Sequence, residues 1–356
     1  MPRQPRSNPA PAKPTRTRAR AGAQPVTLEM VADAAGVSAS TVSRILNGTA
    51  VVSADKKQAV DEAIARLGFV PNPVARGLAG GRTLSIGVVT QSIDSPFYGV
   101  ALRGIEQALG EAGYSPLFVS GHWDAAEEAR CIEVLRSRRV DGIIVLTGRL
   151  SDAALKAHAK ALPVVVTGRT LKAPGLVSLN FDNALGGRLA TEHLLALGHR
   201  RIAFIAGDAV HPDAVDRFNG YRQALDAAGV RFDARLVVPG LYHEQSGLDA
   251  VNALLDAGQD FSAIFAANDQ MAFGAALALY RRGLKVPDDV SLIGFDNLLT
   301  SAYSMPPMSS VHHPAEDIGR QAALAMLQLL RGEVPRPHVP APEVVAREST
   351  RAWRKR

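Results

Sequence analysis

The spacing of apolar residues changes near residue 84 and divides the chain into two regions. Between residues 26 and 69, apolar side chains recur every three or four residues, as in Val60, Ile64 and Leu67. This spacing predicts three short helices around one apolar centre, a module too small to be the whole protein. From Leu84 onward, short β-rich runs alternate with amphipathic helical runs, which predicts a parallel sheet covered by helices on both faces. The β-rich runs are "LSIGVV", "PLFVS", "DGIIVL", "PVVVTG", "RIAFIAG", "SAIFAA" and "VSLIGF".

Polar residues and glycines mark the expected helix ends in the first region. The side-chain oxygens of Thr27, Ser38 and Ser53 can each cap the start of a helix. A tight turn near Gly36 joins the first two helices, and Gly68 ends the third. A helix, a tight turn and a second helix form the geometry of a helix-turn-helix.

An internal repeat divides the second region into two similar halves. The segment "GIEQALGEAGY" at 104–114 aligns with "GYRQALDAAGV" at 220–230, and six of the eleven positions are identical. Both segments follow a predicted strand and end in Ala-Gly just before the next strand. Two similar α/β halves would face each other across a cleft, and ligands of such sheets bind at the carboxyl ends of the strands. A chance likeness between two alanine-rich helices is the alternative.

Charge is unevenly distributed along the chain. The net charge is +6, and residues 1–25 hold six basic residues and no acidic one. These residues include several prolines and little that could pack, so we expect a disordered basic tail. Such a tail would add sequence-independent attraction to phosphates. A solvated leader without a role is the alternative.

Cysteine content and hydropathy indicate the compartment. The chain has one cysteine, Cys131, which excludes a disulfide framework and favours a reducing compartment. We expect this thiol to be buried in the core. No apolar run approaches the ~20 residues of a membrane span, and the basic N-terminus lacks the apolar stretch of a secretory signal. These features predict a soluble, cytoplasmic protein with no membrane partner.

The second helix of the helix-turn-helix lies within "GVSASTVSRILNG", residues 36–48, and offers side chains to DNA. We expect its apolar residues, Val42, Ile45 and Leu46, to face inward. The residues expected on its exposed side are Ala39, Ser40, Ser43 and Arg44. Short hydroxyl side chains let the backbone approach phosphates closely. Arg44 is long enough to donate to guanine O6 and N7 in the major groove.

These motifs carry a family resemblance. The runs "VTLEMVADAAGVSASTVSRILNG" and "VSADKKQAVDEAIARLGFVPNPVARGLAGGRT" strongly resemble the lactose/galactose repressor (LacI/GalR) family of bacterial transcription regulators. Downstream, "SPFY", "VDGIIV", "GHRRIAFIAG", "DRFNGYRQAL", "AANDQMAFGA" and "VPDDVSLIGFDN" are similar to the family's effector-binding core. The likeness extends from residue 26 to about residue 350. It implies a sequence-specific, dimeric, allosteric repressor on a near-palindromic operator.

The resemblance also implies a domain plan and a fold class. We expect a small all-α helix-turn-helix headpiece at 26–70, a hinge at 71–83 and an effector-binding and dimerisation core at 84–350. The core would be α/β, with two similar parallel-sheet subdomains like those of periplasmic binding proteins. Subdomain 1 would span about 84–181 and 312–340, and subdomain 2 about 182–311 and 341–350. Residues 1–25 and 351–356 would be basic tails, the latter too short for a tetramerising heptad segment.

The resemblance assigns headpiece and hinge residues to DNA. Ala39, Ser40 and Arg44 would face base edges. The residues that would mainly hold phosphates are Thr27, Ser38, Thr41, Ser43 and Asn47. In the hinge "PNPVARGLAGG", Leu78 matches the apolar wedge that enters the minor groove, and Asn72, Ala75 and Arg76 would contact the groove and its phosphates. Gly77 departs from the commoner pattern and disfavours a hinge helix by ~1 kcal/mol. A plain flexible linker is the alternative.

The resemblance places a small effector between the two subdomains. Phe97 and Tyr98 match positions that stack on the ligand, and their aromatic faces suit sugar rings as well as flat purines. The other matching positions are Ser95, Arg217, Tyr242, Asn268 and Asp296. We expect Arg169 to enter the cleft as a second arginine, which would tolerate a sugar acid or phosphosugar. A sugar or sugar acid is the expected effector, and a purine or nucleoside is the alternative.

Catalytic and cofactor motifs are missing from the sequence. Neither glycine-rich nucleotide fingerprint occurs, nor a G-x-S-x-G elbow, nor a Cys/His cluster with zinc spacing. The histidines at 193, 199, 312 and 313 are expected to be structural or surface residues. We therefore expect no enzyme activity, no cofactor and no metal. A sugar-uptake binding protein and an α/β enzyme are rival classes, and induction and corepression are equally compatible with the sequence.

Overall fold

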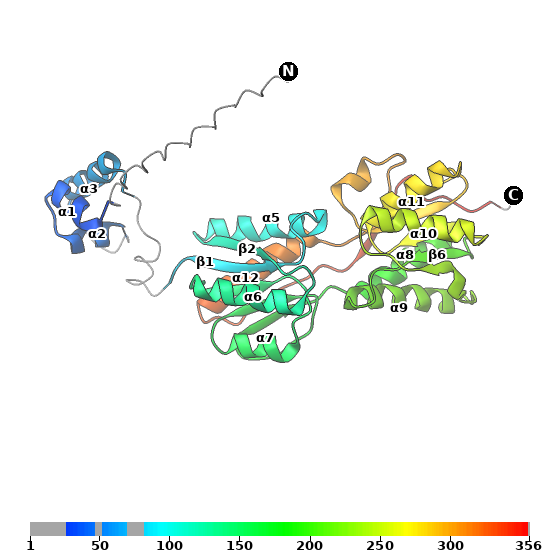
Figure 1. Cartoon of the computed structure of the whole chain (residues 1–356), viewed down its shortest axis with the longest axis horizontal. Coiled ribbons are helices and arrows are strands. Elements are labelled where there is room, and N and C mark those ends of the chain that lie inside the picture. The colour runs from blue at the N-terminus through cyan, green and yellow to red at the C-terminus, as the bar shows by residue number, and fades with distance from the viewer. Residues whose placement is uncertain (1–25, 47–51, 70–81, 355–356) are drawn as a thin grey trace, which may run out of the picture. The chain divides into compact units, whose positions relative to one another are not determined.

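The computed structural model describes residues 26–46, 52–69 and 82–354 (Figure 1). The chain divides into two compact units, residues 1–81 and residues 82–356. Each unit has its own apolar core, and the two are described separately below.

The first unit contains three helices, α1 (Leu28–Ala35), α2 (Ala39–Leu46) and α3 (Ala54–Leu67). Thr27 Oγ1 accepts a bond from Met30 N, and Gly36 ends α1 in the left-handed conformation. Ser38 Oγ accepts from Thr41 N at the start of α2, as predicted. The predicted cap at Ser53 is wrong, because this serine precedes α3 but its side chain forms no capping bond. The core of the unit consists of Val31, Ala32, Val42, Val60, Ala63 and Phe69.

The second unit contains two sheets, and the first is entirely parallel, in the order β2-β1-β3-β4-β5. Its strands are β1 (Ser85–Thr90), β2 (Ser115–Ser120), β3 (Gly142–Val145), β4 (Val164–Thr167) and β5 (Leu176–Leu179). Its helices are α5 (Pro96–Glu111), α6 (Ala125–Ser137), α7 (Asp152–Ala159) and α12 (Ala315–Leu330). Alternate strand residues separate two buried clusters: Val88 packs toward α5 and α12, whereas Val89 packs toward α6. Both faces of the sheet are therefore covered, as the continuous apolar runs predict.

The second sheet has the order β11-β10-β9-β8-β6-β7, and only β11 is antiparallel to its neighbour. Its strands are β6 (Ile202–Ile205), β7 (Val237–Val238), β8 (Ala263–Ala266), β9 (Ser291–Asp296), β10 (Ser309–His312) and β11 (Glu343–Val345). Its helices are α8 (Asn183–Ala196), α9 (Pro212–Ala227), α10 (Glu244–Asp256) and α11 (Asp269–Arg281), and the short 3-10 turns are η1 (Ala234–Leu236) and η2 (Leu299–Ala302). The predicted fold class is confirmed: a helix-turn-helix headpiece is joined in sequence to an α/β core of two parallel-dominated sheets.

The chain passes between the two sheets three times. It leaves the first sheet after β5, returns after β10 to form α12, and leaves again before β11. In Figure 1 the orange helix α12 accordingly lies beside the cyan helix α5, more than 200 residues earlier in sequence. Phe181 and His313 lie in two of these connections, and their rings stack with centroids 4.0 Å apart. The crossings therefore touch one another directly.

The repeated segment forms equivalent helix contacts in the two halves. In the first half, a Cβ on Gly104 of α5 would lie 2.1 Å from the Glu316 carbonyl oxygen of α12. In the second half, a Cβ on Gly220 of α9 would lie 2.1 Å from the Ala184 carbonyl oxygen of α8. Each glycine lets two helix backbones approach more closely than any side chain would allow. The repeat is thus a structural one.

The C-terminal residues differ from the prediction of a tail beginning at 351. Arg351 N donates to Ser291 Oγ at 3.1 Å, and Trp353 N donates to the Leu197 carbonyl at 2.8 Å. Residues 351–353 are therefore attached to the second sheet. Cys131 is buried, as predicted. No helix in the described part of the chain is long and apolar enough to cross a membrane.

Candidate nucleic-acid interface and effector cavity

The outward face of α2 presents fewer side chains than predicted. Ser40 and Arg44 are exposed, and Arg44 Nε donates to the Ser40 carbonyl at 3.2 Å. Ser43 is half-buried, and so is Ala39, which packs against the headpiece core. Ala39 therefore has only part of its surface free, because its methyl group covers the junction between α2 and the apolar centre.

Hydroxyl groups gather at the start of α2. Ser38 Oγ lies 2.9 Å from Ser40 Oγ and 2.8 Å from Thr41 Oγ1. This cluster lies where unpaired backbone N–H groups and the helix dipole favour an anion. The remaining candidates for DNA contact, Asn47, Asn72, Ala75, Arg76 and Leu78, lie outside the described residues.

In the second unit, loops at the carboxyl ends of strands from both sheets surround a cavity of about 420 Å³. This volume is within the range of small-molecule sites. Seven of the eight predicted effector residues line it, namely Ser95, Phe97, Tyr98, Arg217, Tyr242, Asn268 and Asp296. The lining also includes residues that the sequence analysis missed, among them Gln91, Asp94, Trp123, His211 and Asp213.

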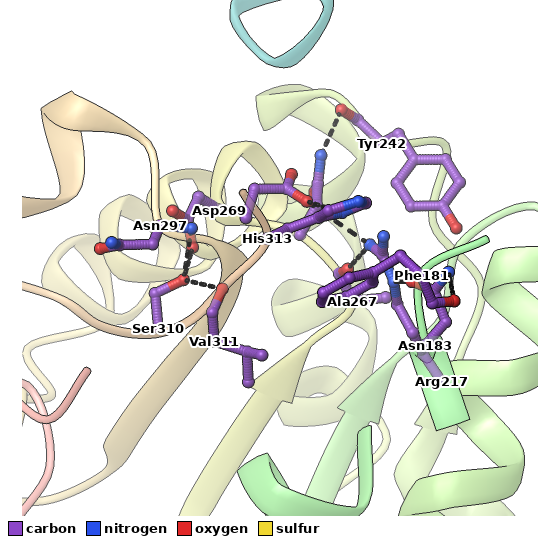
Figure 2. Close-up of polar contacts among 12 residues, drawn as sticks. Phe181, Asn183, Arg217, Tyr242, Ala267, Asp269, Asn297, Ser310, Val311 and His313 are labelled. Atoms are coloured by element: carbon purple, nitrogen blue, oxygen red, sulfur yellow. Dashed lines mark hydrogen bonds and ion pairs between the residues drawn. The ribbon is translucent and has the colours of Figure 1, made fainter. Parts of the chain in front are cut away.

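Arg217 is fixed in one orientation by its neighbours. Its Nε donates to Asn183 Oδ1 at 2.9 Å, and its Nη1 donates to the Ala267 carbonyl at 2.6 Å, as Figure 2 shows. The guanidinium lies over the Phe295 ring, 3.8 Å from its centroid, and 3.8 Å from Asp296 Oδ1. A planar donor held in this way is pre-organised to bind an oxygen of a ligand.

Asp296 occupies a strained and buried position at the end of β9. Its φ is 104°, a region that residues with a side chain rarely adopt, and the next residue, Asn297, also has a positive φ of 54°. Burial raises the pKa of Asp296 to about 7, although Arg217 acts in the opposite direction. The carboxyl group therefore changes charge close to neutral pH.

A second buried carboxylate, Asp269, supports the Asp296 loop. Its Oδ2 accepts bonds from Leu298 N at 2.8 Å and Ser301 Oγ at 2.6 Å. Its Oδ1 accepts from Ser310 Oγ at 2.6 Å (Figure 2). These three bonds join α11, β10 and the loop after β9. Burial raises the pKa of Asp269 to about 7, and the nearby Asp296 acts in the same direction. Asp269 thus holds Asp296 in place without lining the cavity.

The other half of the core contributes most of the aromatic lining. Phe97 and Tyr98, at the start of α5, make an edge-to-face pair with centroids 5.4 Å apart. The Trp123 ring lies 6.4 Å from Tyr98 and 3.7 Å from His211, a residue of the second half. Apolar ring faces on one side and polar groups on the other suit a ligand with one apolar and one hydroxylated aspect.

Several polar atoms around the cavity have no hydrogen-bond partner among the described residues. They are Tyr242 OH, Asp213 Oδ1 and His211 Nδ1 in the lining, and His313 Nδ1 behind it. Burial lowers the pKa of His211 and, more strongly, that of His313, so both rings are held neutral. An unpaired buried polar atom costs about 1–3 kcal/mol unless water or a ligand satisfies it. The cavity therefore offers donors and acceptors to an occupant.

The predicted entry of Arg169 into the cavity is wrong. Its guanidinium instead donates to the carbonyl oxygens of Gly148 and Leu150 and lies 3.3 Å from Asp152 Oδ1. It is absent from the lining, because these bonds hold it against the loop after β3. Arg217 is the only lysine or arginine among the described residues that line the cavity, beside Asp94, Asp213 and Asp296. The argument for two arginines and an anionic ligand therefore fails.

The position of the missed lining residues along the chain could have predicted their role. Gln91, Trp123 and His211 each come one to six residues after a strand, where ligands of parallel sheets bind. Two of the histidines expected to be structural form such contacts: His199 bonds to Ser262 and Ser291, and His193 lies 2.9 Å from Thr350 Oγ1. No group of three metal-binding side chains occurs among the described residues.

Comparison with known proteins decides the family. The model for "Bacterial regulatory proteins, lacI family" matches residues 27–72. The model for "Periplasmic binding proteins and sugar binding domain of LacI family" matches residues 83–346. The chain belongs to the LacI family. It is accordingly a DNA-binding transcriptional regulator.

Individual relatives of this regulator agree with that result. CelR of Thermobifida fusca, an HTH-type transcriptional regulator, is 38% identical over 319 residues, covering 87% of this chain and 94% of CelR. A solved CelR–cellobiose complex is 36% identical with a TM-score of 0.67, over 91% of this chain and 99% of that one. The Lac repressor dimer bound to operator and the anti-inducer ONPF is 31% identical with a TM-score of 0.84, over 92% and 100% of the two chains.

Proposed function

We propose that this regulator is a dimeric repressor of a near-palindromic operator, and that a neutral saccharide bound in the cavity between its two core halves controls it. The observation that carries the proposal is the cavity of about 420 Å³, which aromatic rings from one half and a fixed Arg217–Asp296 pair from the other enclose. A CelR–cellobiose complex among its relatives agrees in ligand class.

The charges of the lining favour a neutral ligand over a sugar acid or phosphosugar. The Arg217 guanidinium is already bonded to Asn183 and Ala267, and it shares the cavity lining with three aspartates, Asp94, Asp213 and Asp296. A ligand carboxylate or phosphate would add a further negative charge beside these aspartates. Among the lining residues that the structure describes, no lysine or arginine other than Arg217 could balance that charge. Sugar hydroxyls both donate and accept, so they can satisfy Tyr242 OH and Asp213 Oδ1 at once. A purine remains the alternative ligand because the aromatic faces would accept it too.

On the DNA side, we propose that α2 is the recognition helix. Arg44 and Ser40 would contact base edges, with a smaller contact from the partly buried Ala39. The hydroxyl cluster of Ser38, Ser40 and Thr41 would hold a phosphate at the start of the helix. Thr27, Ser43 and Asn47 would contact further phosphates. The hinge residues Asn72, Ala75, Arg76 and Leu78 keep the roles that the family resemblance implies.

An exposed apolar surface supports a dimer. Leu299, Tyr303 and Met305, around η2, are 76%, 81% and 97% exposed, and Tyr280 of α11 is 78% exposed. The turn is attached to the start of α11 through Ser301 and Asp269. Monomeric soluble proteins rarely expose large apolar side chains together. We therefore place the contact between two copies at α11 and η2.

A twofold dimer explains how ligand and DNA affect each other. Two identical headpieces related by a twofold axis read a near-palindromic site. If the two arrangements of the core halves differ in saccharide affinity, occupancy of the cavity must change operator affinity by the same factor. The regulator would act in the cytoplasm, without enzyme activity, cofactor or metal.

A thermal-shift screen against sugars, sugar acids, phosphosugars and nucleosides tests the effector class. A neutral saccharide at 100 times its dissociation constant should stabilise the protein by ~2.7 kcal/mol. Sugar acids and phosphosugars should stabilise it less, because the lining residues that the structure describes offer their charge no further lysine or arginine beside Arg217. The proposed class is wrong if only anionic sugars or only nucleosides raise the melting temperature.

A further inference from the structure

One contact across the cavity joins the two halves through aromatic rings. Trp123 follows β2 in the first half, and His211 precedes α9 in the second. Their ring centroids are 3.7 Å apart with the planes at 73°. Tyr98 lies 6.4 Å from Trp123, and Tyr242 lies 5.5 Å from His211. The four rings form a continuous series from one half to the other, and all four line the cavity.

The backbone around Trp123 is held for this placement. His122 and Trp123 have φ values of 51° and 56°, both in the left-handed region that favours glycine. Gln91, at the end of β1, accepts from Trp123 N through Oε1 at 2.9 Å and donates through Nε2 to the Thr147 carbonyl at 2.9 Å. Gln91 is fully buried, so these bonds fix the Trp123 loop to two strands of the sheet. Backbone strain at two successive residues is typical of functional sites, and here it sets the direction of the Trp123 side chain.

The indole has the properties of a sugar-stacking surface. The Trp123 side chain is half-buried: it packs against the apolar core of the first half and also lines the cavity. No described residue accepts a bond from its indole N–H, which leaves that donor to water or a ligand hydroxyl. An indole presents the largest apolar face of any side chain, and that face suits the C–H face of a pyranose ring.

We propose that Trp123 determines saccharide specificity in this regulator, because its indole closes one wall of the cavity against His211 and stacks on the sugar ring. Gln91 is the positioning residue that holds the indole there. This inference rests on the proposed function, because it takes the effector to be a saccharide. The contact between the Trp123 and His211 rings, by contrast, can be measured without a ligand.

The chain offers a direct optical test, since it has only two tryptophans and the second, Trp353, is bonded to Leu197. Trp353→Phe therefore gives a protein whose emission comes from Trp123 alone. Adding His211→Ala to that variant should raise acrylamide quenching of Trp123 about two-fold or more, because the ring that covers it is removed. Unchanged quenching would contradict the contact between the halves.

Ligand titrations test the stacking role, with cellobiose and glucose as first probes and then any saccharide that stabilises the wild type. Trp123→Ala should weaken saccharide binding about tenfold or more, and Trp123→Phe should restore most of the affinity because it keeps an aromatic face. Trp353→Phe is the matched control and should bind like the wild type. Gln91→Met should weaken binding too, with increased quenching of Trp123.

The outcomes separate the two proposals. If a saccharide stabilises the wild type and binds Trp123→Ala equally well, the specificity role is overturned while the proposed function stands. If no saccharide stabilises the wild type, the proposed effector class fails and the stacking role with it. Should Trp123→Ala fail to unfold cooperatively, Trp123→Leu and Trp123→Phe decide the matter, since a role in stacking requires the aromatic variant to bind and the aliphatic one not to.

Discussion

The two halves of the core share a framework but contribute different chemistry to the cavity. In each half a glycine of the repeated segment, Gly104 or Gly220, lets two helices meet at backbone distance. At the strand ends the halves diverge: the first supplies Phe97, Tyr98 and Trp123, and the second supplies most of the polar groups around Arg217. The comparison teaches that the repeat preserves helix packing, while the loops at the carboxyl ends of the strands have diverged to make an asymmetric site.

The largest expected effect tests the shared framework. Gly104→Ala and Gly220→Ala should each lower the free energy of unfolding by about 2–3 kcal/mol, because the added methyl group would press on a backbone carbonyl. Gly110→Ala is the matched control on α5, where a Cβ meets nothing within 4 Å, and should stabilise by about 0.5–1 kcal/mol. Chemical denaturation measures all three. If Gly104→Ala lowers the free energy of unfolding and Gly220→Ala does not, the two halves do not share the same helix packing.

The second prediction concerns Asp296, in the half that supplies the polar groups, and the way in which the free energy of unfolding depends on pH. Burial raises the pKa of Asp296 from 3.8 to about 7, so between those values the folded protein keeps a proton that the unfolded chain has released. The free energy of unfolding therefore falls as pH rises through that window. Asp296→Asn should therefore stabilise the ligand-free protein at pH 8, where the buried carboxylate is ionised, and by little at pH 4.

The same variant should lose its response to the effector while still binding DNA, because the carboxylate beside Arg217 is gone. Thermal unfolding at both pH values and effector titration of the operator complex provide the two measurements. Equal destabilisation at pH 4 and pH 8 would mean that Asp296 is ionised and well paired in the folded state. A retained effector response would remove Asp296 from the site.

The smallest effect tests a difference within the repeat itself. Tyr221 aligns with Ile105, and its hydroxyl donates to the Ile202 carbonyl at 2.9 Å, a bond that isoleucine cannot make. Tyr221→Phe should lower the free energy of unfolding by about 1 kcal/mol. Chemical denaturation measures the change. An unchanged free energy of unfolding would mean that the second half does not depend on this bond.

The sequence predicted the framework better than the site. Helical spacing and the capping residues Thr27 and Ser38 were sufficient for the headpiece, and long apolar runs were sufficient for most of the strands. The sequence did not predict the strands β5, β7, β10 and β11. Three of them, β5, β10 and β11, are short and include polar residues, and β7 has only two residues, so none forms a continuous apolar run. Ser53 shows that a capping residue in the right place does not guarantee the capping bond.

The family resemblance predicted most of the residues that line the effector cavity, but it did not predict in which direction each side chain points. Arg169 lies two residues after β4, in the loop at the carboxyl end of that strand, yet carbonyl oxygens of a neighbouring loop bind its guanidinium. Trp123 and His211 follow strands, so their place in the lining could have been predicted. The contact between their rings could not, because it forms only when the two halves fold against each other. Contacts of this kind depend on tertiary structure and leave no local pattern in the sequence.

The central claim is that occupancy of the cavity changes how tightly paired headpieces hold a near-palindromic operator. Footprinting of the full-length protein on its own upstream DNA, with and without the saccharide identified by thermal shift, tests it most directly. The account predicts one protected near-palindrome, whose affinity changes about 5–150-fold with ligand and is weakened by Arg44→Ala. No protected palindrome, or protection that the bound saccharide leaves unchanged, would contradict the account.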